Sequence, residues 1–303
     1  MRRLPPLLAC LLAAAVLFGC SDGGGGSNAS VTAVATTTQL ADFVHDVGGE
    51  RVSVDSILRP NSDPHEYEPR PSDAAAIAKA DVVFRSGGDL DGWLDEVVDS
   101  AGGDADQVTL IDSVKREGDD PHWWQDPRNV ILAVAAIRDA LTKVDPDGRA
   151  GYARRAAAYT AKLRRLDSEV ARCIGRVPPA ERKLVTTHDA LGYFADRYGI
   201  EVIGAVIPSL STQAQPSAKD VGQLVDQIKS EGVRAIFPEA ALSEKLEQAI
   251  SREAGAEVGG QLWADTLGPE GSSGETYLGA VRSNAATLAK GMSGGSVTCA
   301  FSR

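Results

Sequence analysis

The sequence predicts an α/β protein of two lobes, each built on a parallel-type sheet flanked by helices and joined by one long rigid linker helix. The chain of 303 residues is longer than a typical single core. Strand-like and helix-like segments alternate in both halves, which is the pattern of parallel sheets covered by helices. Between the halves, no Gly or Pro interrupts the Ala-, Arg- and Leu-rich sequence from Gly151 to Gly175. We therefore expect an N-terminal lobe over residues 31–145, the linker helix over 146–178 and a C-terminal lobe over 179–303.

Hydrophobic periodicity gives the order of elements in each lobe. In the first half it predicts strands at 31–36, 51–58, 81–84 and 108–111, with helices at 39–47, 74–80, 90–100 and 130–141. In the second half it predicts strands at 183–187, 202–206, 233–237 and 261–264, with helices at 191–198, 218–229, 243–254 and 277–289.

The first twenty residues differ from the rest. Arg2 and Arg3 precede an apolar run that is too short for a membrane span but suits a secretory signal. The run ends in Leu17-Phe18-Gly19-Cys20, which resembles a bacterial lipobox. We expect residues 1–19 to be a lipoprotein signal peptide, Cys20 to be lipidated, and the glycine-rich residues 20–30 to form a flexible tether. The protein would then be exported and anchored to the cell membrane only by this lipid, facing the periplasm or the cell exterior; a plain signal or a membrane helix is the alternative.

Charge and cysteine content agree with export. The formal charge of −11 argues against a nucleic-acid partner, because no large basic face is available to neutralise phosphates. Once Cys10 leaves with the signal and Cys20 is lipidated, only Cys173 and Cys299 remain. Two cysteines in an oxidising compartment favour one disulfide, with two free thiols as the alternative.

Three of the four histidines lie in short segments flanked by Asp or Pro. His65, His122 and His188 each follow a predicted strand, and ligands of open α/β sheets bind beyond the carboxyl ends of strands. Imidazole is a frequent ligand of transition metals. We therefore expect these three side chains to share one metal ion, two from the first lobe and one from the second. His45 is the contrast, because it lies within a predicted helix beside acidic residues and is expected to face solvent.

The second lobe should supply a fourth ligand, and the residues alone leave two candidates. Glu239 follows Phe237-Pro238 and Asp265 follows Trp263-Ala264, each after a predicted strand. Either carboxylate would serve equally well as a helix N-cap or as a solvated acid.

Several segments together resemble the zinc- and manganese-binding lipoproteins that deliver metal to bacterial ABC importers. The similarity runs in order along essentially the whole mature chain and is clearest at Pro64–Pro69, Asp120–Pro127, His188–Phe194, Ala264–Leu267, Glu275–Leu278 and Arg282–Asn284. It implies that His65, His122, His188 and Asp265 are the metal ligands and that Glu239 is an acid beside the cleft that supports them. It also implies an ABC importer permease as partner, and we expect a monomeric receptor.

Three imidazoles and one carboxylate suit tetrahedral Zn(II), so zinc is the expected cargo, with Mn(II) as the alternative. Trp123 and Trp124 would either form an apolar wall that keeps water from the site around His122 or pack in the core between the lobes. A metal-containing adhesin is a further alternative. A zinc hydrolase is disfavoured, because Asp265 would occupy the water position and no HExxH helix is present.

The chain departs from many zinc members in one respect: only Glu117-Gly118-Asp119-Asp120 stands where those members carry a long His-rich loop. We also expect the linker helix to limit lobe closure, so that metal release depends on loop motion near His65, His122 or Asp265.

Overall fold

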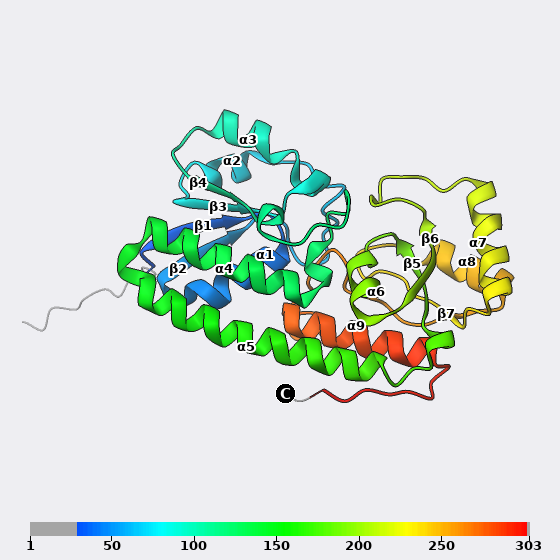
Figure 1. Ribbon diagram of the computed structural model, residues 1–303. Coiled ribbons are helices and arrows are strands. Elements are labelled where there is room, and N and C mark those ends of the chain that lie inside the picture. Colours follow the sequence, from blue (N-terminus) through cyan, green and yellow to red (C-terminus); the bar gives the residue numbers. More distant parts are fainter. Residues whose placement is uncertain (1–28, 302–303) are drawn as a thin grey trace, which may run out of the picture.

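The computed structural model describes residues 29–301, and it contains the predicted two lobes and linker helix (Figure 1). The signal peptide, Cys20 and most of the tether fall outside the described residues. The lobe limits at residues 145 and 178 remain predictions. Within the described part of the chain, no helix is long and apolar enough to cross a membrane.

The N-terminal lobe contains a four-stranded parallel sheet in the order β2-β1-β3-β4. Ala33, Val34 and Ala35 of the inner strand β1 are fully buried, as expected where helices cover both faces of a parallel sheet. The elements of this lobe are β1 (Val31–Ala35), α1 (Thr38–Gly48), β2 (Val52–Ser56), α2 (Pro71–Ile77), β3 (Val82–Arg85), α3 (Leu94–Ala101), β4 (Asp106–Thr109) and α4 (Pro127–Val144).

The C-terminal lobe has two parallel pairs, β5-β6 and β7-β8. A parallel bridge between Thr186 and Phe237 joins the two pairs. Its elements are β5 (Lys183–His188), α6 (Gly192–Tyr198), β6 (Glu201–Ile207), α7 (Ala218–Glu231), β7 (Ala235–Ile236), α8 (Lys245–Ala254), β8 (Glu257–Val258) and α9 (Tyr277–Met292).

One predicted strand is wrong. Residues 261–264 do not form a strand, and the last strand β8 lies earlier, at Glu257–Val258. Gly259 and Gly260 follow it, and Gly260 has a φ of 112°, a backbone conformation that does not continue a strand. Beyond this break, Leu262 makes only an isolated bridge with Glu239.

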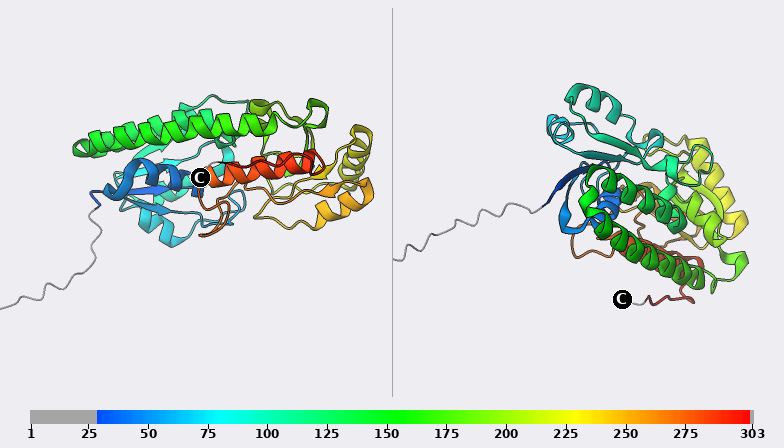
Figure 2. Two further views of the ribbon diagram at one scale, coloured as in Figure 1. Left: turned by 90° about the horizontal axis from the view of Figure 1, so that it is seen from below. Right: turned by 60° about the vertical axis from the view of Figure 1, so that its left-hand side comes forward.

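The linker helix α5 (Arg149–Ile174) has 26 residues, about 39 Å at 1.5 Å per residue. It runs beneath both lobes with α9 beside its second half (Figures 1 and 2). One face is buried along its whole length, at Tyr152, Ala156, Tyr159, Leu163, Leu166, Glu169, Val170, Cys173 and Ile174. All of these side chains except Glu169 belong to one hydrophobic cluster that continues from β1 and α1 to α6 and α9. The lobes therefore share a core.

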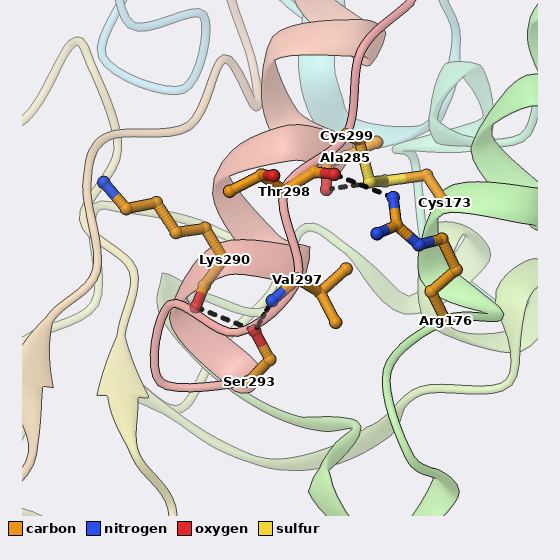
Figure 3. Close-up of a disulfide and its surroundings, with 8 residues drawn as sticks. All are labelled: Cys173, Arg176, Ala285, Lys290, Ser293, Val297, Thr298 and Cys299. Atoms are coloured by element: carbon orange, nitrogen blue, oxygen red, sulfur yellow. Dashed lines mark hydrogen bonds between the residues drawn. A yellow bond between two sulfur atoms is a disulfide. The ribbon is translucent and has the colours of Figure 1, made fainter.

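Cys173 at the end of α5 and Cys299 in the C-terminal tail form a disulfide, with their Cα atoms 5.7 Å apart (Figure 3). Arg176 donates a hydrogen bond to the carbonyl of Thr298 at 2.8 Å, and the Ser293 hydroxyl accepts one from the backbone N–H of Val297 (Figure 3). The tail is thus fastened to the linker helix and to the end of α9.

Candidate metal centre

The four predicted ligands lie together between the lobes. His65 follows β2, His122 follows β4, His188 ends β5, and Asp265 follows β8. One donor atom from each lies within 4.8 Å of the others. His45, in contrast, is exposed on α1 and lies outside this group. The positions of the histidines at strand ends therefore predict which of them meet, while their role as ligands remains a proposal.

The imidazole Nε2 atoms point toward one another and toward Asp265. Nε2 of His122 lies 3.4 Å from Nε2 of both His65 and His188. Asp265 Oδ2 lies 3.1 Å from His188 Nε2 and 3.2 Å from His65 Nε2, and Oδ1 lies 3.5 Å from His122 Nε2. Donor atoms bonded to one ion at about 2.0–2.1 Å in a tetrahedron would be separated by about 3.3–3.4 Å. The spacing matches a small divalent cation.

Each fully buried histidine ring is oriented by a carboxylate on its far side. His122 Nδ1 lies 2.7 Å from Asp120 Oδ1, and His188 Nδ1 lies 2.8 Å from Glu239 Oε1. Such partners favour a proton on Nδ1 and leave the Nε2 lone pair free for a metal. Glu239 thus lies in the supporting position that the resemblance implies. Asp120 was not singled out, although its Asp-Pro-His segment repeats Asp63-Pro64-His65 and could have indicated a shared local role.

The two tryptophans have different positions. Trp124 packs edge-on against the His122 ring with centroids 5.5 Å apart, and its Nε1 donates a hydrogen bond to the carbonyl of Ala264. Trp123 instead donates to the hydroxyl of Ser86 and packs against Phe43 in the N-terminal core. Of the two roles expected for this pair, the place beside the site is taken by Trp124, and Trp123 packs the core.

The segment that carries Asp265 is held by the opposite lobe. The Ala264 carbonyl accepts a second hydrogen bond from Gln125 Nε2 at 2.8 Å. Tyr277, at the start of α9, donates its hydroxyl to the carbonyl of Trp124 at 2.7 Å. Gln125 could not be recognised from the sequence, because nothing local to Trp123-Trp124-Gln125 indicates a partner 139 residues away.

The buried histidines and carboxylates of the metal-free centre shift one another's pKa values. Burial disfavours the charged ring of His188, but Asp265 and Glu239 outweigh it and raise the pKa of His188 to about 11. Burial likewise disfavours the ionised carboxylate of Asp265, yet His188 and His122 hold its pKa well below the ordinary value. Neither oxygen of Asp265 accepts a well-aligned hydrogen bond within the described structure. A buried carboxylate with both oxygens turned toward three imidazoles has the donor chemistry of a metal site.

The fold and this centre define a two-lobed α/β protein with a His₃Asp site for a divalent metal cargo. Residues 33–291 match the family model "ZnuA: Zinc-uptake complex component A periplasmic", and the chain belongs to this family of metal-binding receptors of ABC importers, which are not enzymes.

Relatives cover nearly the whole chain. It is 33% identical over 281 residues to the manganese-binding lipoprotein MntA of Halalkalibacterium halodurans, covering 91% of each chain. It is 32% identical to MntA of Bacillus subtilis, covering 94% of this chain and 98% of the relative. The solved periplasmic zinc-binding protein TroA of Treponema pallidum superimposes with a TM-score of 0.81 at 29% identity, covering 87% of this chain and 99% of that structure.

Proposed function

We propose that this protein is a lipid-anchored extracytoplasmic receptor that captures Mn(II) between its lobes and delivers it to an ABC importer permease, with Zn(II) as the competing ion. The observation that supports it most strongly is the convergence of three imidazole Nε2 atoms and both oxygens of Asp265 on one point. His65, His122, His188 and Asp265 would be the ligands. Glu239 and Asp120 would orient two of the rings.

The choice between the two metals rests on two different kinds of observation. The donor set and its spacing favour zinc, as expected from the sequence. The names of the curated relatives favour manganese, since both MntA proteins are named manganese-binding, whereas the family model and the TroA structure are named for zinc. We give the relatives more weight, because nearly any nitrogen and oxygen site binds Zn(II) more tightly than Mn(II), whichever ion the cell delivers. The two oxygens of Asp265 could also supply a fifth donor, which suits the higher coordination number of manganese.

Export and anchoring follow from the same relatives, which are named lipoproteins. We propose that Cys20 carries the lipid and that residues 20–30 tether the receptor to the membrane surface. The shared core along α5 favours small movements of the loops around the metal over wide closure of the lobes. A carboxylate in the position that a catalytic water would need argues against hydrolysis.

The test is a chelator competition with Mn(II) and Zn(II) on the metal-free protein, using His122→Ala and the matched control His45→Ala. His122→Ala should lose affinity for both ions by at least a hundredfold, whereas His45→Ala should bind as the parent does. Metal analysis of protein purified from its own cell envelope should find manganese. Equal affinity of His122→Ala and the parent would refute the site, and zinc in the native protein would refute the choice of cargo.

A further inference from the structure

Two of the proposed ligands lie in the same tripeptide, Asp-Pro-His, at residues 63–65 and 120–122. In both copies the first carboxylate accepts a hydrogen bond from the histidine backbone N–H, at 2.9 Å from Oδ1 of Asp63 and at 2.9 Å from Oδ1 of Asp120. The proline between them restricts the backbone, so each aspartate fixes the position of its histidine.

The remaining contacts of the two aspartates differ. Asp120 also bonds the His122 ring, and both residues belong to one loop. Asp63 instead uses its second oxygen to contact the other lobe, where Oδ2 accepts a hydrogen bond from the Thr212 hydroxyl at 2.7 Å. Gln213, the next residue, donates its side-chain amide to the carbonyl of His65. Both contacts come from the irregular segment between β6 and α7.

The contact between Asp63 and Thr212 is shielded from water on the threonine side. Thr212 is only 6% exposed, although it lies in a loop, and Asp63 is half-buried. A hydroxyl that donates to a carboxylate in such a place makes a stronger bond than one at the open surface.

His65 is the residue of the metal centre that is not buried as a whole. His122 and His188 are fully buried and Asp265 nearly so, whereas His65 is half-buried, although its side chain is only 6% exposed, like that of Asp265. Its exposure therefore lies mainly in the backbone of its loop, and the segment around Thr212 crosses from the other lobe to hold that loop.

We propose that Asp63 and Thr212 form an interlobe latch that positions His65 and sets the rate at which metal leaves. With the latch closed, His65 stays on the ion. When it opens, the His65 loop can move away while His122, His188 and Asp265 keep their places. The latch rests on the proposed function, since it acts through His65 as a ligand, but neither Asp63 nor Thr212 touches the metal.

The test compares Thr212→Val, which keeps the shape and removes the donor, with Thr212→Ser, which keeps the hydroxyl. Protein loaded with Mn(II) or Zn(II) is mixed with excess chelator, and the dissociation rate is followed by stopped flow. Thr212→Val should release metal about tenfold faster or more, because a part-buried hydrogen bond to a charged group is lost. Thr212→Ser should stay within about twofold of the parent. Thr142→Val is a matched control, because its hydroxyl bonds the Arg138 carbonyl within α4.

Urea unfolding of the metal-free proteins separates positioning from general stability. The latch predicts that Thr212→Val raises the metal dissociation rate much more than Thr142→Val does, even if the two variants have equal unfolding free energies. If Thr212→Val does not fold, Gln213→Ala at the exposed neighbouring position should also accelerate release. A parent that binds no metal would refute the proposed function. A parent that binds metal and a Thr212→Val variant that releases it at the parent's rate would refute the latch alone.

Discussion

Nδ1 of His188 lies 2.8 Å from Oε1 of Glu239, and the same oxygen accepts the backbone N–H of His188 at 3.0 Å. One carboxylate therefore fixes both the ring and the backbone of this proposed ligand. The backbone N–H of Glu239 is in turn held by the hydroxyl of Thr187 at 3.2 Å. The orientation of His188 Nε2 toward the centre thus depends on residues that do not face the centre themselves.

Replacement of Glu239 by Gln should weaken metal binding by about 10–100-fold, because loss of the carboxylate behind a ligating imidazole lowers its basicity and loosens its orientation. Isothermal titration with Zn(II) measures the change. Glu253→Gln, on the exposed side of α8, is the control and should bind as the parent does. Unchanged affinity of Glu239→Gln would contradict the role given to Glu239.

Asp265→Ala should lose most of the stabilisation that metal gives the parent. An ion that binds only the native state stabilises it by about 4 kcal/mol at a free concentration 1,000 times its Kd. Thermal unfolding with and without Mn(II) should therefore show a large rise in Tm for the parent and little for the variant. An equal rise for both would mean that the ion binds without this carboxylate.

The raised pKa of Asp42 predicts a pH dependence of stability that does not involve the metal centre. This side chain of α1 accepts hydrogen bonds from the backbone N–H of Tyr277 at 3.1 Å and from the hydroxyl of Tyr159 at 3.4 Å. Burial raises the pKa of Asp42 to about 7; the Tyr277 and Tyr159 bonds and Lys162 partly oppose the rise, and Asp46 adds to it. A carboxyl with a raised folded-state pKa contributes stability that is fully present below pH 3.8 and is lost as pH rises through 7.

The variant Asp42→Asn, which resembles the neutral acid, should lose this dependence. The unfolding free energy of the variant minus that of the parent should therefore rise by up to about 3 kcal/mol between pH 5 and pH 8. Urea unfolding of both proteins in the presence of chelator measures the difference, and Asp55→Asn on the exposed edge of β2 is the control. Parallel pH profiles of parent and Asp42→Asn would contradict the prediction.

Removal of the disulfide should affect stability but not metal binding. The bond closes a loop of 126 residues, for which chain entropy sets a ceiling of about 5 kcal/mol. The double variant Cys173→Ser/Cys299→Ser should therefore unfold at lower urea concentration. Its affinity for Zn(II) should equal that of the parent. The disulfide joins α5 to the C-terminal tail, and none of the contacts described at the metal centre involves α5 or the tail. A large loss of affinity would show that the tail supports the metal site.

The sequence predicted the alternation of elements and the three histidines, because strand ends and ligand chemistry are local properties. It left Asp265 and Glu239 open, since both follow strands and only the resemblance separated them. The structure shows why: Asp265 faces the three Nε2 atoms, and Glu239 lies behind His188. Contacts that depend on how the lobes meet, such as Gln125 with Ala264 or Thr212 with Asp63, have no local signal.

Anomalous diffraction from crystals of the manganese-loaded protein would locate the bound ion. We expect one strong peak per chain at the manganese edge, within bonding distance of His65, His122, His188 and Asp265. A peak elsewhere, or one that lacks the Asp265 carboxylate among its ligands, would contradict it.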